Sequence, residues 1–353
     1  MSGPHLILTK PRHAESYSMH TSTIPASDLT PEMLATWREI QRGNPALRNP
    51  FFCPEFTQAA ALVQEEIHIG IYVDKPLEMV AFLPFKQVKK GKAAAIQFSD
   101  YHGLIAPANF SIDGQSLLRA WGLNSFDFRY VPTDQQPFQS STFEQNDSHV
   151  IDLKQFTDSG KESRKLRKLA REVGPVRFES HTTEPAVLQK LIEWKREHCK
   201  RTGFEDLLRD RWTRDLLGVL QHTQAKEFSG QLSALYAGDR LVAAHLGLRS
   251  ATVWHWWFPS YDAELSKYSP GLLMLLKLIE HAQQVGCEEF DFGVGEEGFK
   301  QRFATGVVPV GKGSMKGSGW QQSVAHKLWQ ADRRISQSRF GDRYQSLFHH
   351  ASN

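Results

Sequence analysis

Two histidines lie on strand-like stretches of the 353-residue chain, where either could exchange a proton with a substrate. His245 interrupts a run in which alternate residues are apolar, so its side chain points to the opposite side of the predicted strand. His255 alternates in the same way with Val253 and Trp257. Histidine titrates near neutral pH, which suits it to general-base chemistry. Each residue is therefore a candidate base or substrate contact, or else a core histidine bonded to backbone.

Two charged residues near the C-terminal end are also candidates. Asp291 stands between Phe290 and Phe292 at a predicted strand end, and a carboxylate buried there needs a partner. It could orient a substrate or simply cap the Gly-rich turn that follows. Lys300 follows Glu296 by four residues on a predicted helix, which is the spacing of an ion pair. Lys300 could therefore have a structural role, in an ion pair with Glu296, or a role in ligand binding.

A polar turn in the first third of the chain brings three further side chains together. Asp100, Tyr101 and His102 are consecutive and could line a cleft between domains. The dipeptide Ser99-Asp100 before them is also typical of an ordinary turn.

The stretch 254–271 runs from an aromatic strand into a polar loop that ends in Ser-Pro-Gly. Ser269 is a good N-cap and Pro270 fits the first helical position, so a helix is predicted from here to near Gly286. The start of a helix presents backbone N–H groups that can hold a phosphate or carboxylate. A β-α-β packing unit with nothing bound has the same pattern.

A basic segment lies between the two halves of the chain, over residues 161–171. Its cations are Lys161, Arg164, Lys165, Arg167, Lys168 and Arg171. Such a run is often a solvated helix face, but it could also contact a phosphate-bearing ligand or an RNA backbone. No aromatic residues are interleaved with it to stack bases, which weakens the nucleic-acid interpretation.

Composition describes a globular protein of about two domains. The formal net charge is +3, and three scattered cysteines indicate neither a disulfide framework nor a zinc site. No apolar run is long enough for a signal peptide or a membrane span, so we expect a cytoplasmic protein. The chain has no nucleophile elbow, P-loop, dinucleotide fingerprint or zinc-protease motif, and His349-His350 has no further ligands, so no metal is expected.

The predicted elements form two modules. Residues 1–25 are expected to be a flexible leader. Helices from Thr30 and Asn49 precede strands at 67–73, 79–85, 93–98, 126–131 and 149–153, in a domain covering 26–155. A second domain is predicted over 156–320. After the basic helix its elements are, in order, a strand at 176–180, helices at 184–200 and 212–221, strands at 228–236, 241–248 and 252–258, the helix from Ser269, a strand at Phe290, a helix at 296–303 and a strand at 307–315. A terminal helix and tail occupy 321–353.

This order resembles the GNAT acyltransferase superfamily, and particular motifs resemble its BioF/CelD-like branch, which is associated with polysaccharide or cellulose biosynthesis. The similar stretches are 233–249, 257–262, 268–273 and 291–300, together with 49–56 and 99–105 in the first module. The piece 299–303 also resembles the Fem-type peptidyltransferases, which use aminoacyl-tRNA. The resemblance implies an α/β (α+β) protein of tandem GNAT-like domains, with mixed, mainly antiparallel sheets flanked by helices.

The resemblance further implies an enzyme that binds an acyl-CoA, most simply acetyl-CoA. Its pantetheine arm would follow the aromatic strand, and its diphosphate would lie at the helix start. The residues expected to bind it are Trp256, Trp257, Phe258, Lys267, Ser269, Gly271 and Leu272. The family loop is richer in glycine than this one, and Pro270 removes an N–H donor, which puts CoA binding in question.

For catalysis, the resemblance points to His245, Asp291 and Lys300, with Lys300 on a donor phosphate or the acyl oxyanion. Residues expected to contact the acceptor are Asp100, Tyr101, His102, His255 and Tyr261. The acceptor would be an amine or hydroxyl of a sugar or cell-envelope precursor. Two alternatives remain: transfer from aminoacyl-tRNA through the basic helix, and a non-catalytic scaffold for a polysaccharide synthesis complex.

Overall fold

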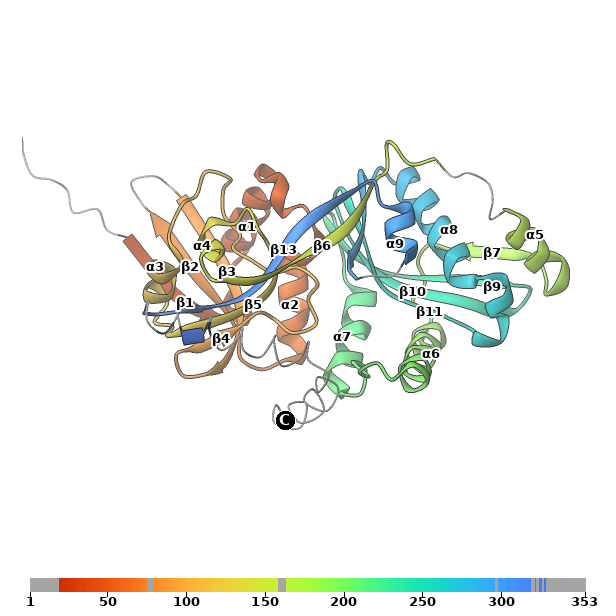
Figure 1. The fold of residues 1–353 in the computed structure, drawn as a ribbon, viewed down its shortest axis with the longest axis horizontal. Helices are drawn as coiled ribbons and strands as arrows, with labels where there is room; N and C mark the ends of the chain where they lie inside the picture. Colours follow the sequence, from red (N-terminus) through yellow and green to blue (C-terminus); the bar gives the residue numbers. More distant parts are fainter. Residues whose placement is uncertain are drawn as a thin grey trace, which may run out of the picture.

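A computed structural model describes residues 19–74, 79–157, 163–295, 298–318, 321, 324, 325 and 327. Figure 1 shows two halves lying side by side, each with helices packed on a sheet. The first half comprises residues 19–152 and the second comprises residues 163–316. The mixed α/β architecture with helices flanking a mixed sheet confirms the predicted fold class.

The described part of the first half begins with a strand at Met19. Residues 19–25 form β1 (Met19–Pro25), which pairs antiparallel with β2 along its whole length. This corrects the expected leader at 1–25, of which residues 1–18 lie outside the described part. The remaining elements are α1 (Pro31–Gly43), α2 (Pro54–Val63), β2 (Ile67–Asp74), β3 (Met79–Lys89), β4 (Lys92–Ala94), α3 (Gly114–Ala120), β5 (Ser125–Pro132), α4 (Gln136–Gln139) and β6 (Thr142–Asp152).

The second half contains the longer helices. Its elements are α5 (Ser163–Glu172), β7 (Val176–Glu179), α6 (Pro185–Thr202), α7 (Arg211–His222), β8 (Gln224–Ala225), β9 (Phe228–Ala237), β10 (Arg240–Ser250), β11 (Val253–Tyr261), the 3-10 helix η5 (Ala263–Tyr268), α8 (Pro270–Gln284), β12 (Glu289–Val294), α9 (Gly298–Phe303) and β13 (Gly306–Lys316). Most of the predicted terminal helix lies outside the described residues; Gln321, Val324, Ala325 and Lys327 within it are helical.

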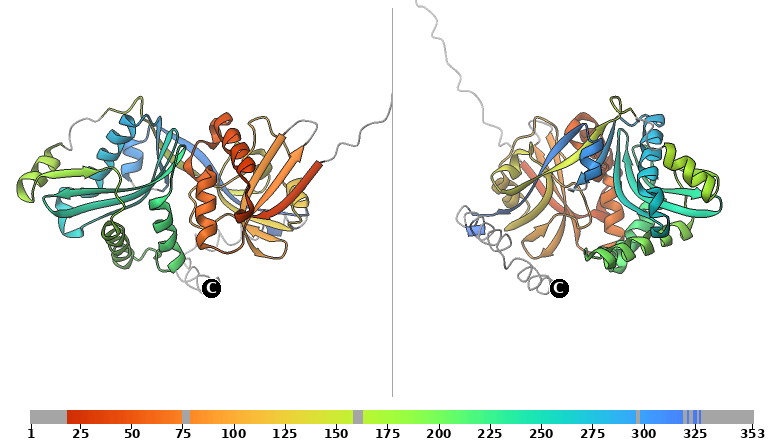
Figure 2. Two further views of the ribbon diagram at one scale, coloured as in Figure 1. Left: turned by 180° about the vertical axis from the view of Figure 1, so that it is seen from behind. Right: turned by 45° about the vertical axis from the view of Figure 1, so that its right-hand side comes forward.

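The two halves exchange strands. The sheet runs β1-β2-β3-β4-β5-β13-β6-β12-β11-β10-β9-β7, with β8 beside β9. Thus β6, from the first half, pairs with β12 of the second, while β13, from the second, pairs with β5 of the first. Figures 1 and 2 show both strands running between the halves. Chain order alone places the strand predicted at 307–315 in the second module. In the structure this strand, β13, pairs with β5 and so extends the sheet of the first half.

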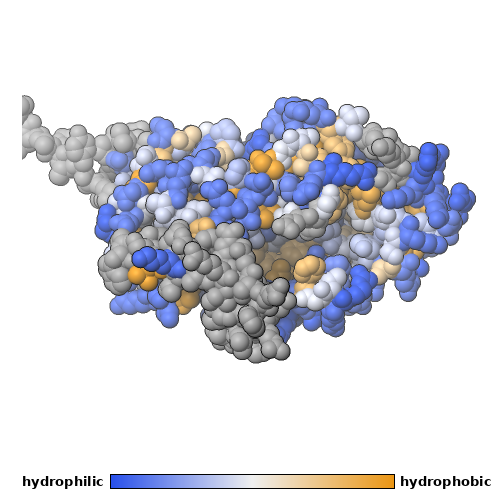
Figure 3. Space-filling view, viewed as in Figure 1, coloured by the Kyte–Doolittle hydropathy of each residue, from blue (hydrophilic) through white to orange (hydrophobic). Residues whose placement is uncertain are grey.

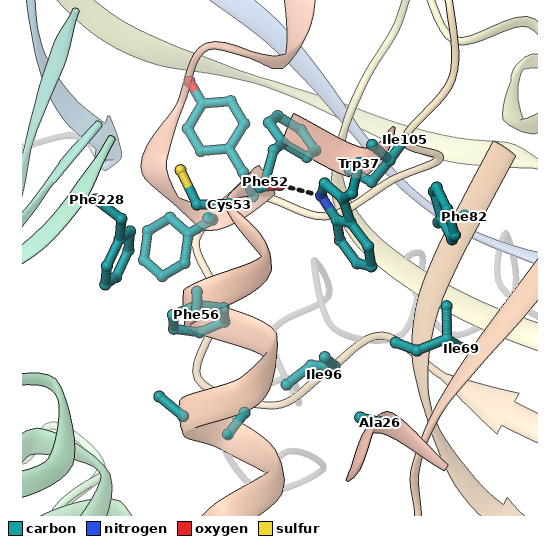
Figure 4. Packing of buried hydrophobic residues seen from close by; sticks show 14 of the residues in the cluster. Ala26, Trp37, Phe52, Cys53, Phe56, Ile69, Phe82, Ile96, Ile105 and Phe228 are labelled. Atoms are coloured by element: carbon teal, nitrogen blue, oxygen red, sulfur yellow. Dashed lines mark hydrogen bonds between the residues drawn. The ribbon is translucent and has the colours of Figure 1, made fainter. Parts of the chain in front are cut away.

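The halves also share a hydrophobic core. Phe52, Phe56 and Trp37 of the first half belong to the same buried cluster as Leu220 and Phe228 of the second. Figure 4 shows Phe56 and Phe228 in this cluster, and Trp37, whose indole N–H donates to the carbonyl of Phe52 at 2.8 Å. Because this cluster contains buried residues of both halves, the two halves share one hydrophobic core where they meet.

The second half has a forked sheet. β11 and β12 are parallel and pair only from Val253 to His255 and from Glu289 to Asp291. Beyond these residues β12 stays paired with β6 on its other side, while β11 continues beside β10. A β-bulge lies in β11 just after the fork, where the register with β10 shifts between Leu246 and Leu248. Pro259, which cannot donate to a ladder, is tolerated in β11 because one edge of the strand is open beyond the fork.

The first half has the same parting of strands, but a loop closes it. β4 and β5 are parallel over three residue pairs and then diverge. The loop that follows β4 fills the gap: Ala95 donates to the carbonyl of Asp127 at 2.8 Å, and the backbone of His102 donates to that of Tyr130 at 3.2 Å. The open fork is thus confined to the second half.

Candidate active site

A cavity of about 460 Å³ opens at the fork. On one face of the sheet it is bounded by the start of α8 and by α9, and on the other by α6, with β11 between them. Figure 3 shows a hollow near the middle of the molecule with apolar residues at its floor. The cavity wall consists of Trp194, Lys195, Glu197, His198, Arg201, Trp256, Pro259, Ser260, Tyr261, Ala263, Ser266, Ser269, Pro270, Gly271, Leu272, Leu275, Phe299, Arg302 and Phe303.

Five of the residues predicted to contact substrate or donor line this cavity: Trp256, Tyr261, Ser269, Gly271 and Leu272. Trp257 and Phe258 do not. Trp257 alternates with Trp256, and the bulge turns Phe258 away from the cavity, so both side chains lie on the α6–α7 face of the sheet. There Trp257 packs against Phe51 of the first half, and Phe258 joins the cluster beneath α6 and α7. Lys267 does not line the cavity either.

The start of α8 differs from the predicted cap. Ser269 occupies the N-cap position in a left-handed conformation (φ 56°, ψ 53°), and its hydroxyl makes no cap hydrogen bond. Its carbonyl accepts from the backbone of Leu272 at 3.0 Å and Leu273 at 3.1 Å, and Pro270 has no N–H. Ser269 is therefore the N-cap residue, as predicted, but its hydroxyl accepts from Lys165 at 3.1 Å and caps no backbone N–H. Few backbone donors remain here for an anion.

A buried polar cluster lies at the fork, on the side that faces the first half. Asn49 donates to Asp291 at 2.8 Å, and the Ser148 hydroxyl donates to the same carboxylate at 2.9 Å. The ring of His255 lies with Nε2 3.0 Å from Asp100 Oδ2 and Nδ1 3.7 Å from Asp291 Oδ1. His255 and Asp291 are the last paired residues before the strands part. The cluster therefore lies at the base of the gap.

The charges in this cluster stabilise one another. Burial would lower the pKa of His255, but the carboxylates of Asp291 and Asp100 raise it to about 9, so the ring is a cation at neutral pH. Burial opposes ionisation of Asp291, yet His255 and the N–H of Gly293 hold its pKa below the usual value. Burial, followed by the Asp291 charge, raises the pKa of Tyr101, whose ring packs edge-on to His255.

Exposure singles out one member of the cluster. The side chains of His255 and Asp291 are at most 1% exposed, whereas that of Asp100 is 36% exposed. Asp100 is therefore the member that a substrate can reach.

The structure separates the other predicted residues from this cluster. His245 is fully buried behind Trp256, with ring centroids 4.3 Å apart, and accepts from the backbone of Trp257 at 3.3 Å. Burial, then the charge of His255, lowers its pKa well below the usual value. A neutral ring in this position packs behind the cavity wall and does not reach its interior.

Lys300 and His102 also point elsewhere. Lys300 is buried and donates to the carbonyl of Val294 at 3.0 Å, which fixes the end of β12. Its predicted partner Glu296 lies outside the described residues. His102 bonds to the carbonyl of Pro84 at 2.8 Å and stacks on Phe126, and burial lowers its pKa to about 4. It belongs to the closed gap of the first half.

Sequence reasoning missed several residues of the site. Asn49 lies in the 49–56 stretch that carried the family resemblance, but nothing there pointed to a contact with β12. Ser148 had no signal, because only the strand exchange brings β6 to Asp291. Three basic residues of α6 that line the cavity, Lys195, His198 and Arg201, recur every three residues, and this spacing would have placed them on one helix face.

Residues 160–301 match the family model described as an acetyltransferase (GNAT) domain. The chain has no match among curated protein sequences. The match supports a GNAT acetyltransferase domain over these residues, and with it an acyltransferase.

Solved structures with a similar fold cover most of the chain. One is the C-terminal domain of a putative lysylphosphatidylglycerol synthetase from Agrobacterium fabrum, with TM-score 0.51 and 12% identity over 85% of this chain and 96% of that one. Another is FemX, with TM-score 0.51 and 13% identity over 79% and 93%. A tandem GNAT protein from the clavulanic acid biosynthesis pathway has TM-score 0.48 and 9% identity over 85% and 99%. The first two likenesses concern the fold alone.

Two further findings apply to the described part of the chain. None of its helices is both long and apolar enough to cross a membrane. In the same residues, no three or more His, Cys, Asp or Glu side chains are grouped so as to hold a metal ion.

Proposed function

We propose that this chain is an N- or O-acyltransferase of the BioF/CelD-like branch that moves an acyl group from acyl-CoA. The acceptor is an amine or hydroxyl of a sugar or cell-envelope precursor, and the simplest donor is acetyl-CoA. The observation that carries the proposal is the cavity beside the fork, whose wall includes Trp256, Tyr261 and the start of α8, just beyond the last β11–β12 residue pair. A thioester lying in the gap would be accessible from both faces of the sheet.

The donor fits the cavity in shape and charge. Beyond the fork, the free edge of β11 can bond to the amides of a pantetheine arm. Trp256, Phe299 and Phe303 supply apolar walls beside it. Lys195, Arg201 and Arg302 give the rim a positive character that suits a phosphorylated ligand.

The acceptor would approach from the side of the polar cluster. Its nitrogen or oxygen attacks the thioester carbonyl carbon, the carbon–sulfur bond breaks, and CoA leaves as a thiolate that is then protonated. Asp100 takes the proton that the acceptor loses, because it is the exposed member of the cluster. His255 and Asp291 are positioning residues, which hold Asp100 through the 3.0 Å bond to His255 Nε2. His245 has no part in this scheme.

The proposal predicts that Asp100→Asn lowers kcat for acyl transfer about 100-fold while KM for the acyl-CoA changes little. Rates would be measured with acetyl-CoA and longer acyl-CoAs against a panel of amino sugars. Asp239→Asn, which changes an exposed turn carboxylate, is the matched control. Equal rates for Asp100→Asn and the wild type would remove Asp100 from the mechanism, and no transfer to any acceptor would oppose acyl transfer itself.

A further inference from the structure

The basic helix α5 packs beside the mouth of the cavity. It carries five cations, Arg164, Lys165, Arg167, Lys168 and Arg171. Leu169 is fully buried in the core beneath α8, and it shares one face of the helix with Lys165 and Glu172 at spacings of four and three. This face lies against η5 and the start of α8, so the helix is docked rather than solvated on all sides.

Both ends of that face are fixed by side-chain contacts. At the C-terminal end, Glu172 accepts from the Tyr268 hydroxyl at 2.8 Å and lies 3.7 Å from Lys267 Nζ. At the N-terminal end, Lys165 Nζ lies 3.1 Å from the hydroxyl of Ser269. Since Ser269 lines the cavity, the Lys165 ammonium lies next to the cavity wall.

The backbone at this position has few donors of its own. Pro270 lacks an N–H, and the amides of Leu272 and Leu273 are occupied by the Ser269 carbonyl. A phosphate bound here must therefore be held chiefly by side chains. Lys165 and Ser269 offer an ammonium and a hydroxyl, and the Lys168 ammonium lies 5.8 Å from the Tyr268 ring centre on the same side of the helix.

We propose that α5 is the phosphate-recognition element of this protein, with Lys165 and Ser269 binding a phosphate group of the donor. Side chains from a helix thereby replace a glycine-rich backbone cradle. Lys267, whose ammonium lies between Glu172 and the Tyr268 ring, supports the helix rather than the ligand. The inference rests on the proposed function, because it takes acyl-CoA as the donor.

The test compares two donors that share a thioester but differ in phosphate. Acetyl-CoA and S-acetylpantetheine, which lacks every phosphate, are titrated into wild type, Lys165→Ala and Arg164→Ala. Arg164→Ala is the matched control, because it removes the same charge from the adjacent, exposed position. We expect Lys165→Ala to weaken acetyl-CoA binding about tenfold and to leave S-acetylpantetheine binding unchanged. Arg164→Ala should change acetyl-CoA binding less than threefold at physiological salt.

The outcomes separate the inference from the proposed function. Equal effects of the two variants, or an equal loss with both donors, would overturn the role of Lys165 while leaving acyl-CoA as the donor. If the wild type binds neither thioester, the proposed function fails and the inference fails with it. If the wild type instead binds tRNA, and Lys165→Ala weakens that complex, the phosphates that α5 recognises are those of RNA and the assignment to acyl-CoA is wrong.

Discussion

His255 is the residue whose environment says most about the site. It is fully buried at the base of the fork, between a buried carboxylate and a half-exposed one. A cation held in this way neutralises Asp291, and in the proposed mechanism the exposed Asp100 faces the acceptor. Asp100, Tyr101, His255 and Asp291 were all singled out from the sequence, but only their assembly shows that Asp100 is the member open to substrate.

The charge of His255 should be measurable directly. Its pKa is raised to about 9 in the folded protein, above the usual 6.5. The cation therefore contributes stability that is fully present below about pH 6.5 and is lost as the pH rises through 9, with a slope of at most about 1.4 kcal/mol per pH unit. NMR titration of the ring and urea unfolding between pH 6.5 and 9.5 would measure it.

Asp291→Asn is the matched variant for that titration, because it removes the carboxylate that most raises the pKa of His255. The pH dependence of its unfolding free energy should be flatter over the same interval. A His255 ring that titrates near 6.5 in the wild type would contradict the description of the cluster as a shared ion network.

At the level of elements, the β11 bulge and the fork decide which side chains meet the cavity. Alternation along 253–258 predicts that Trp256 and Phe258 share a face, but the bulge sends Phe258 to the other one. Likewise, the tripeptide Ser269-Pro270-Gly271 correctly predicted the start of a helix. The local sequence did not predict the left-handed backbone of Ser269 or the packing of α5 against this helix start. Bulges and caps depend on partners distant in sequence, which one chain does not reveal.

Gly247 offers a test of the fork. It lies in β10 opposite the bulge, and a Cβ added there would meet the backbone oxygen of His255 at 2.6 Å and the ring of His245 at 2.4 Å. Gly247→Ala should therefore lower the free energy of unfolding by about 1–3 kcal/mol and reduce acyl transfer. Gly218→Ala, in α7 with nothing within 4 Å of its added Cβ, should instead raise stability by up to about 1 kcal/mol.

Urea unfolding of both variants measures the difference. A Gly247→Ala protein as stable and active as the wild type would mean that the backbone around His255 yields easily, which is incompatible with a rigid fork.

At the scale of the whole molecule, strand exchange joins the halves into one unit. Helices 184–200 and 212–221 and the three consecutive strands after them were predicted closely, because their patterns are local. The exchange of β6 and β13 between the halves was not predicted, because adjacency in the chain does not specify which sheet a strand joins. The domain boundaries near residues 155 and 320 remain predictions. The sheet itself continues across the boundary near residue 155, because β6 pairs with β12.

The exchange predicts a single cooperative unfolding transition. Removing either half would strip β12 of β6, or β5 of β13, and open the shared core around Phe56 and Phe228. Calorimetry of the full chain should give one transition whose van't Hoff and calorimetric enthalpies agree. Two separate transitions, or a fragment of residues 156–318 that folds and binds acyl-CoA alone, would contradict the account of one shared sheet.

The central claim is that an acyl-CoA occupies the cavity at the fork, and calorimetric titration of acetyl-CoA tests it most directly. The wild type should bind one equivalent in the micromolar range, about −8 kcal/mol. Ala263→Trp, which places a bulky side chain on an exposed wall of the cavity, should abolish binding, while Ala225→Trp on exposed β8 should not. Binding that survives Ala263→Trp, or no binding of any acyl-CoA to the wild type, would contradict the claim.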